Sequence, residues 1–221
     1  MIWRIYSHFY DSLLITPPYK KLLIELNERA NIKPEETVVD LGSGTGNFAQ
    51  ISKRNDSGYY CIDGSPEMLK ISKRKVPHCN HILSDLNSTK IPIKNNHADK
   101  VVSNNSVYAV NDIDNLFNEV YRILKPNGLF VFSNSIRKDN KPIIIEILRS
   151  ISLIKFISNF LTYVKLIGVL LINIFISNKY ETQFYSKESL IAALEKNHFK
   201  VIENTYSYEG INVLIVARKQ S

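Results

Sequence analysis

The sequence predicts an α/β fold in which a mostly parallel β-sheet is covered by helices on both faces. Three observations support this prediction: five short apolar runs alternate with helical segments, a glycine-rich loop follows the first run, and a tight turn joins the last two strands. Strands that alternate with helices form parallel sheets, whereas two strands joined by a tight turn are antiparallel. We therefore expect one reversed strand near an edge of the sheet.

The composition is that of a soluble globular protein, with 44% hydrophobic and 22% charged residues in 221 positions. The net charge of +7 favours acidic partners such as nucleic acid, anionic lipid or an anionic substrate. Cys61 and Cys79 are too few for a disulfide framework, so a reducing, cytoplasmic location is expected. The first 15 residues lack the cleavage pattern of a signal peptide.

The first half of the chain is expected to begin with helices over residues 2–31, interrupted at Pro17 and Pro18. A helix should start after the glycine-rich loop, near residue 48. Another should start at Ser65, because Ser65, Pro66 and Glu67 supply an N-cap, a first-turn proline and a first-turn acid. Four strands are expected in this half, at residues 37–41, 58–62, 81–83 and 100–104.

The second half continues the alternation and then reverses direction. Asp112 or Asp114 should cap a helix with one apolar face, and residues 125–128 should form a turn before a fifth strand at 129–133. Ser186 should cap the last helix. Two further strands, at residues 199–204 and 211–217, are joined by a tight turn and are therefore antiparallel.

Residues 137–180 interrupt this alternation with a long apolar segment. Its longest charge-free part, residues 166–178, is shorter than the roughly 20 apolar residues of a membrane-spanning helix, so no span is predicted. The first half of the segment has an amphipathic pattern, and Gly168 is expected to divide the segment into two helices.

The loop VVDLGSGTGNF, residues 38–48, is the strongest indicator of function. Glycines at alternate positions let a ligand approach the backbone at the carboxyl edge of the sheet. A phosphate-binding P-loop would need a lysine directly after the last glycine, and none occurs before Lys53. A dinucleotide fingerprint would need a glycine at Asn47. An NAD-dependent oxidoreductase is therefore a weaker alternative.

Several motifs in order resemble those of the class I S-adenosylmethionine-dependent methyltransferases, and among them the UbiE-like group that acts on small molecules and lipids. The resemblance implies a Rossmann-like sheet of seven strands in the order 3-2-1-4-5-7-6. It also implies one methyltransferase domain over residues 1–221, with N-terminal helices at 1–31 and a helical cap at 137–180 after strand five. The similar segments are residues 38–48, 61–69, 84–93 and 118–134, with Asn127 replacing a usual glycine.

The resemblance implies a site for S-adenosylmethionine, with S-adenosylhomocysteine as the product. Asp40 suits the ammonium group, Asp63 the ribose hydroxyls and Asp85 the adenine amino group, although each could be a loop or turn acid instead. Met68 and Leu86 could enclose the adenine ring, and Met68 could equally be helix core. The implied cofactor-binding residues are Asp40, Gly42, Ser43, Gly44, Gly46, Asp63, Gly64, Met68, Asp85, Leu86 and Asn104.

Catalytic candidates are three tyrosines. A Tyr-Asp pair near the N-terminus often lies over the cofactor in this family, which points to Tyr10, with Tyr6 one turn earlier. Tyr108 stands where many relatives carry histidine, so the usual candidate base is absent. Packing alone is the alternative for all three tyrosines. No metal site is expected, because the run from His78 to His81 has the character of a loop.

The acceptor is expected to be a small, lipophilic molecule. Nucleic acid is disfavoured, because the loop after strand four reads SNNSVY rather than an Asn-Pro-Pro-aromatic motif and neither cysteine follows a proline. The apolar, weakly basic cap suits a lipid, a quinone or a natural product, and residues 143–178 could contact a membrane surface peripherally. A homodimer interface in the cap and a non-catalytic protein that binds S-adenosylmethionine are the alternatives.

Overall fold

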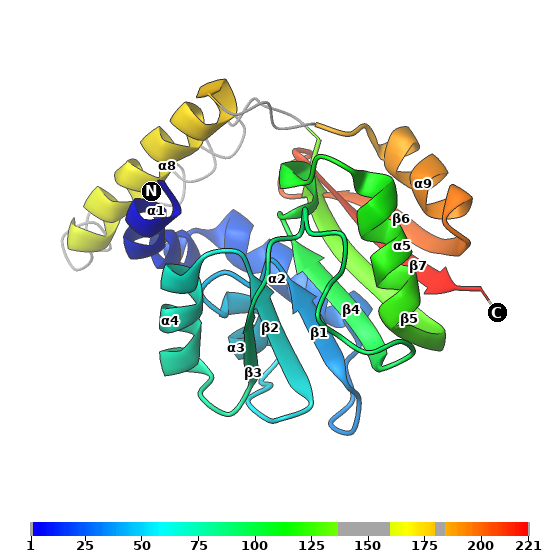
Figure 1. Cartoon of the computed structure of the whole chain (residues 1–221). Helices are drawn as coiled ribbons and strands as arrows, with labels where there is room; N and C mark the ends of the chain where they lie inside the picture. The colour runs from blue at the N-terminus through cyan, green and yellow to red at the C-terminus, as the bar shows by residue number, and fades with distance from the viewer. Residues whose placement is uncertain (1, 137–159, 180–183, 221) are drawn as a thin grey trace.

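A computed structural model describes residues 2–136, 160–179 and 184–220. Its centre is a sheet of seven strands with helices on both faces (Figure 1). The strands are β1 (Val38–Leu41), β2 (Tyr59–Asp63), β3 (Asn80–Leu83), β4 (Ala98–Asn104), β5 (Leu124–Ser135), β6 (Phe199–Ser207) and β7 (Asn212–Lys219). The α-helices are α1 (Ile2–Tyr10), α2 (Pro17–Ala30), α3 (Asn47–Ile51), α4 (Pro66–Lys75), α5 (Ile113–Ile123), α8 (Phe160–Lys179) and α9 (Lys187–Lys196), and the 3-10 helices are η1 (Asp11–Ile15) and η2 (Val107–Ala109).

The strand order is β3-β2-β1-β4-β5-β7-β6, as the family resemblance implied. Strands β1 to β5 pair in parallel, and β7 runs antiparallel to both β5 and β6. The prediction of a mostly parallel sheet with one reversed strand near the edge is therefore confirmed. The carboxyl ends of the parallel strands meet at one edge, which is where ligands bind in such sheets.

Two buried clusters fill the two faces of the sheet, because side chains alternate along each strand. Val38 of β1 belongs to the cluster under α2, α4 and α8, whereas Val39 belongs to the cluster under α5 and α9. Helix α8 packs against α1 and η1, on the opposite side of the molecule from α9 (Figure 1). The N-terminal helices and the helix that follows strand five thus cover the same region.

The helix starts follow the capping signals in the sequence. The Ser65 and Ser186 hydroxyls accept hydrogen bonds from the Met68 and Ser189 amides, at 3.3 and 3.1 Å. Asp112, rather than Asp114, caps α5 through the Asn115 amide at 3.0 Å.

The turn expected at residues 125–128 is instead an interruption within β5. Ala98 of β4 pairs with Leu124 and Lys100 pairs with Leu129, so the residues between Leu124 and Leu129 bulge out of the ladder. Asn127 adopts a φ of 64°, which explains why a short polar residue stands there. The strand begins before the bulge because the pairing of β4 extends to Ala98.

The prediction that Gly168 separates two helices is wrong, because Gly168 lies inside the continuous helix α8. A Cβ at this position would come within 3.1 Å of Cδ1 in the Phe9 ring. Glycine therefore serves the close approach of α8 to α1 rather than a break in the chain. The amphipathic first half of the segment lies outside the described residues.

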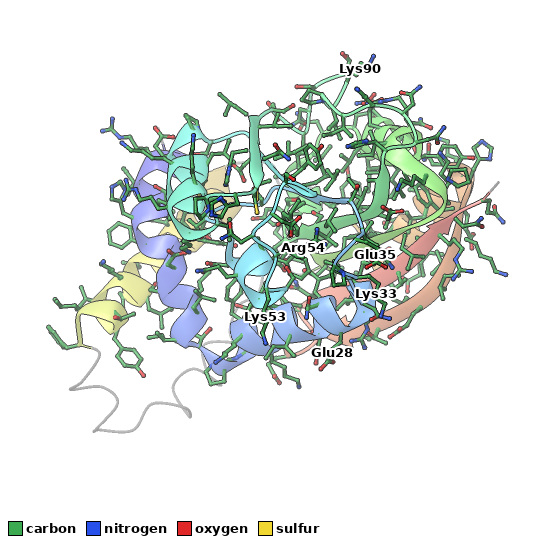
Figure 2. The ribbon with its side chains drawn as sticks, turned by 90° about the horizontal axis from the view of Figure 1, so that it is seen from below. Glu28, Lys33, Glu35, Lys53, Arg54 and Lys90 are labelled. Atoms are coloured by element: carbon green, nitrogen blue, oxygen red, sulfur yellow. The ribbon has the colours of Figure 1, made fainter. Side chains whose placement is uncertain are left out.

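At the amino end of the sheet, Arg54 holds together the loops around β1. Its guanidinium donates to the Lys33 and Glu36 carbonyl oxygens, each at 3.0 Å, and pairs with Asp56 at 2.6 Å. Arg54 is buried in the interior, whereas the labelled Lys33, Lys53 and Lys90 lie near the outside (Figure 2). This arrangement fixes the entry to β1, whose far end carries the glycine-rich loop.

Candidate active site

The glycine-rich loop leaves β1 at the carboxyl edge and is held between neighbouring loops. The Gly42 and Ser43 amides both donate to the Ile62 carbonyl oxygen, at 2.8 and 3.0 Å. Gly42 has a φ of 69°, and a Cβ there would lie 2.3 Å from the Ser106 Cβ. Gly44 and Gly46 also have positive φ, so the loop geometry requires glycine at alternate positions.

Asp63 lies at the tip of β2, directly beside this loop. Its two carboxylate oxygens accept from the Gly44 and Ser65 amides, each at 2.8 Å. Burial raises the pKa of Asp63, and the two amide hydrogen bonds oppose that effect. Each oxygen keeps a further lone pair, so the carboxylate can still accept two hydroxyl donors. That capacity fits the ribose of a nucleoside.

Asp40, two residues before the loop, is almost completely buried. Burial raises its pKa to about 7, even though the Tyr59 hydroxyl donates to its Oδ2 at 3.0 Å. A buried carboxylate without a nearby cation is unfavourable. Asp40 is therefore suited to receive a cationic group, such as the ammonium of an amino acid, directly or through water.

The proposed adenine side is less complete. Gly64 approaches the backbone of Asp85, whose Cα would lie 3.7 Å from an added Cβ. The Asp85 side chain is exposed, and its Oδ1 accepts from the Asn87 amide at 2.9 Å, as in a turn. Leu86 is half-buried beside Gly42, whereas Met68 lies in the core under α4. The structure thus brings Leu86 to the loop but directs Asp85 toward its own turn.

The tyrosines, far apart in sequence, gather over the glycine-rich loop. A Cβ on Gly44 would lie 3.6 Å from the Tyr10 ring, and the Tyr10 and Tyr6 ring centroids are 5.3 Å apart. The hydroxyls of Tyr10 and Tyr19 are 2.9 Å apart. Tyr108, in η2 after β4, stacks on Phe184 with centroids 6.2 Å apart. Tyr108 also acts electrostatically on Tyr10, so the N-terminal helices and the β4 loop meet at this edge.

Burial governs the acid–base properties of these tyrosines. It raises the pKa of Tyr10 and Tyr108, and Tyr19 adds to the effect on Tyr10. Burial also raises the pKa of Tyr19 to about 12. All three phenols therefore stay protonated at neutral pH and are suited to donate hydrogen bonds rather than to remove a proton.

An ion pair fastens the N-terminal segment to the loop. Lys75 of α4 lies 2.6 Å from Asp11 Oδ1, and the Thr45 hydroxyl donates to the same oxygen at 2.6 Å. Lys75 also donates to Asn47 Oδ1 at 2.7 Å. The sequence patterns did not indicate this cluster, because periodicity does not reveal which polar groups meet across distant elements.

Buried polar atoms without a partner gather at the same edge. In the described part of the chain these atoms are Ser43 Oγ, Asn47 Nδ2, Asn134 Oδ1 and Asn212 Oδ1. Ser43 lies between Gly42 and Gly44, and its unused hydroxyl fits a polar ligand in the loop, whereas the Asn47 side chain also interacts with Tyr19. Asn104 ends β4, and its Oδ1 accepts from the Ser133 hydroxyl at 2.6 Å. The residues present therefore fit a zwitterionic amino acid joined to a nucleoside.

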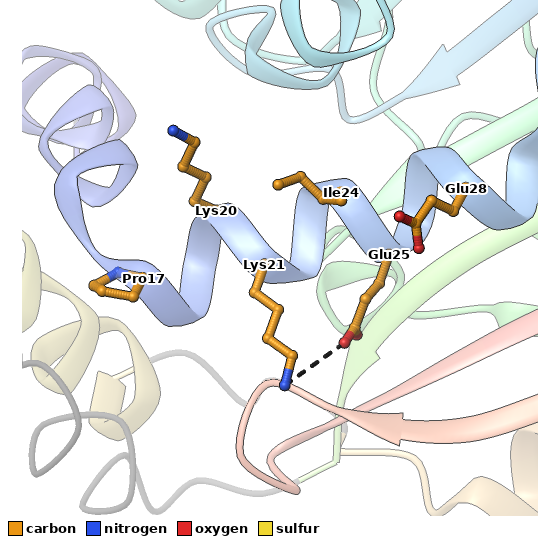
Figure 3. A pocket seen from close by; sticks show the side chains of 6 residues that line it. All are labelled: Pro17, Lys20, Lys21, Ile24, Glu25 and Glu28. Carbon is orange, nitrogen blue, oxygen red and sulfur yellow. Dashed lines mark ion pairs between the residues drawn. The ribbon is translucent and has the colours of Figure 1, made fainter.

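Other features of the described residues do not compete with this site. A shallow hollow of about 440 Å³ lies on α2, away from the glycine-rich loop, and its residues include the ion pair Lys21–Glu25 at 3.8 Å (Figure 3). Within residues 2–136, 160–179 and 184–220, no group of three metal-binding side chains occurs. Over the same residues, no helix has the length and apolar character needed to cross a bilayer. In the run from His78 to His81, the His81 ring contacts α4, with its Nε2 3.1 Å from the Ser72 hydroxyl.

Comparisons with known proteins agree with this geometry. A methyltransferase domain family model matches residues 39–132. An uncharacterized protein from Methanocaldococcus jannaschii is 31% identical over 202 residues, which are 87% of this chain and 72% of that protein. Two methyltransferases match over shorter segments. The malonyl-[acyl-carrier protein] O-methyltransferase of Serratia marcescens is 26% identical over 45% of this chain and 38% of its own length, and the demethylmenaquinone methyltransferase of Streptomyces avermitilis is 28% identical over 48% and 46%.

The fold is similarly shared. A chain from the complex between the Haloferax volcanii Trm112 methyltransferase activator and a methyltransferase superimposes with a TM-score of 0.70 and 15% identity, covering 99% of this chain and 98% of that one. The motif order, the strand order and the loop geometry lead to the same conclusion. The chain belongs to the class I S-adenosylmethionine-dependent methyltransferases and uses S-adenosylmethionine as its methyl donor.

Proposed function

We propose that this methyltransferase acts on a small lipophilic molecule that it reaches at a membrane surface. The observation that supports this proposal is the two-sided character of α8. Its inner residues Leu166 and Val169 pack into the core that contains Tyr6, Tyr19 and Met68. Its outer residues are exposed apolar side chains: Phe160, Leu161, Val164, Ile167 and Leu171, of which Leu161 is 75% exposed.

These exposed residues recur at helical spacing and form one apolar stripe, which we call the α8 stripe. Exposed apolar surface of this kind is a mark of an interaction site. Lys165 of α8 and Arg4 of α1 are exposed, and α8 contains no acidic residue. An apolar stripe on a helix that carries the exposed Lys165 and no acid suits the surface of an anionic bilayer. A lipophilic acceptor would then pass from the bilayer to the site under α1 and α8.

The cofactor contacts are part of the same proposal. The glycine-rich loop binds the carboxylate of the methionine part through the unpaired Ser43 hydroxyl, because the Gly42, Ser43 and Gly44 amides already donate to Ile62 and Asp63. Asp40 receives the ammonium group and Asp63 the ribose. Leu86 and Met68 border the adenine, with Asp85 near its amino group, and Asn104 lies along the methionine part. Asp63→Ala should lower the affinity for S-adenosylhomocysteine by at least about tenfold in calorimetry, because a charged acceptor of two hydroxyls is lost. Asp99→Ala is the control, since Asp99 also accepts a backbone amide, from Thr37 at 2.9 Å, but at the opposite end of the sheet.

When bound, the cofactor would supply a methyl group on a positively charged sulfur, and the acceptor atom would bond to the methyl carbon as the carbon–sulfur bond breaks and the neutral thioether leaves. The chain contributes mainly position: the glycine-rich loop and Asp63 hold the donor, and α1, η1 and α8 close over it. Tyr10 and Tyr108, protonated at neutral pH, orient the acceptor by donating hydrogen bonds. Tyr6 borders Tyr10 and shapes the same side of the site.

The membrane contact is tested by co-sedimentation of the full chain with vesicles of phosphatidylcholine and phosphatidylglycerol. The triple variant Leu161→Ser, Ile167→Ser, Leu171→Ser should lose most of the vesicle-bound fraction. The control variant, Leu83→Ser with Ile202→Ser, changes exposed apolar residues at the two edge strands and should bind as the wild type does. Equal binding of both variants, or no binding of the wild type, contradicts the proposal. A wild-type dimer that dissociates in the triple variant would instead assign the α8 stripe to self-association.

A further inference from the structure

Two buried asparagine side chains have amide oxygens that contact no donor. Asn134 in β5 and Asn212 in β7 are completely buried, and the Oδ1 of each is without a hydrogen-bond partner. Nearly all buried polar atoms in folded proteins are paired. An unpaired buried oxygen therefore marks a place where a ligand or a buried water supplies a donor.

Asn212 belongs to a group of polar side chains at the carboxyl edge, which we call the amide cluster: Asn104, Asn105, Ser133 and Asn212. The Asn212 amide nitrogen donates to Asn105 Oδ1 at 2.6 Å, and the Ser133 hydroxyl donates to Asn104 Oδ1 at 2.6 Å. The cluster is uncharged, and these internal bonds leave Asn212 Oδ1 as an unused acceptor.

The amide cluster lies on the same face of the sheet as the tyrosines. Because side chains alternate along a strand, Asn212 shares a face with Leu214, which belongs to the core that includes Tyr19. Tyr208, in the turn before β7, packs against that same core. Burial raises the pKa of Tyr208, so its phenol is protonated and carries no charge near the amide cluster. Asn134 lies on the opposite face, toward α5, by the same alternation.

We infer that Asn212 Oδ1 accepts a hydrogen bond from the methyl acceptor, which is therefore a neutral amine or a hydroxyl compound. This inference rests on the proposed function. An amide oxygen can only accept, so its partner must carry an N–H or O–H group. The cluster itself contains no carboxylate. The Glu25 carboxylate near it already pairs with Lys21 and accepts from the hydroxyl of Ser207, the residue opposite Asn212, so an ammonium group is disfavoured. A hydrogen bond from the acceptor fixes the direction of its lone pair, so Asn212 is a positioning residue for the transfer.

The test measures binding rather than turnover. Dissociation constants are measured by ligand-observed NMR on the full chain saturated with S-adenosylhomocysteine. The probes are para-butylphenol and para-butylaniline, each compared with its methylated counterpart, para-butylanisole and N,N-dimethyl-para-butylaniline. The wild type should bind each donor probe about tenfold more tightly than its counterpart, because the methylated probe leaves the amide oxygen unpaired. Asn212→Leu should abolish this preference, and Asn134→Leu, the matched control, should keep it.

Each result decides the inference. Equal affinities for donor and methylated probes in the wild type overturn it, whether or not Asn212→Leu folds, and so does failure of the donor probes to bind. A preference that persists in a folded Asn212→Leu variant assigns the unpaired oxygen to a buried water and also overturns it. Failure of the wild type to bind S-adenosylhomocysteine in calorimetry would instead refute the proposed function on which the inference depends.

Discussion

The buried carboxyl group of Asp40 predicts an unusual dependence of stability on pH. Its pKa is raised by burial from 3.8 to about 7, so the native state binds a proton more tightly than the unfolded chain does. The stabilisation from this proton is fully present below about pH 4 and is lost as the pH rises through 7. The difference between the two values corresponds to about 4 kcal/mol.

Asp40→Asn removes this titration with little change in shape. The asparagine oxygen can still accept from the Tyr59 hydroxyl, which lies 3.0 Å from Asp40 Oδ2. Between pH 5 and pH 8, the free energy of unfolding of the variant should therefore rise relative to the wild type by about 2.5 kcal/mol. For a chain of this length that is a change in Tm of about 5–10 °C.

The assay is thermal unfolding of the ligand-free protein at pH 5, 6, 7 and 8, at constant ionic strength. Asp99→Asn is the control. Although burial of Asp99 acts to raise its pKa, Lys125 and the Thr37 amide lower it below the ordinary value. Asp99 is therefore ionised throughout the range from pH 5 to 8. The free energy of unfolding of Asp99→Asn should differ from that of the wild type by a constant amount over this range. A constant difference between Asp40→Asn and the wild type from pH 5 to 8 would refute the reasoning.

Three further predictions follow from the same site. Binding of S-adenosylhomocysteine at pH 7 should release about half a proton, because Asp40, with a pKa of about 7, is half protonated there and an ammonium group lowers that pKa; calorimetry in two buffers of different ionisation enthalpy measures this, and Asp40→Asn should release none. Gly42→Ala should lower the free energy of unfolding by about 2–4 kcal/mol in denaturant unfolding, because Gly42 has a positive φ and an added Cβ would clash with Ser106. Gly210→Ala, at a positive φ in open space, should lower it by about 1 kcal/mol, and equal losses for the two variants would contradict this account. Lys75→Met should speed hydrogen exchange in residues 2–16 by about three- to tenfold, because the ion pair between Lys75 of α4 and Asp11 of η1 is lost. Lys73→Met, at an exposed position of α4, should leave the exchange rates of these residues unchanged.

Much of the fold could be read from local patterns in the chain. Apolar runs marked the strands, and the capping residues Ser65 and Ser186 marked the starts of two helices. The positive φ angles at Gly42, Gly44 and Gly46 follow from a loop that only glycine can adopt, so the ligand-binding edge was also predictable. These signals act over a few residues, and the sequence carries them directly.

Other features depended on contacts between distant segments. Gly168 carries the local signal of a helix break, yet the approach of Phe9 explains it. Residues 125–128 carry the signal of a turn, yet the pairing of β4 with Leu124 and Leu129 makes them a bulge within β5. In both cases a short-range pattern allowed two outcomes, and packing selected one.

By itself, the sequence determined the sheet, the glycine-rich loop and the methyltransferase family, because strand periodicity and loop conformation are local properties of the chain. Only the tertiary structure decided which polar groups meet at the edge of the sheet. The ion pair of Asp11 with Lys75, the contact between Tyr10 and Tyr19, and the hydrogen bond from Asn212 to Asn105 each join different segments of the chain. Such contacts depend on how complete helices and strands pack, and no spacing within one segment specifies them.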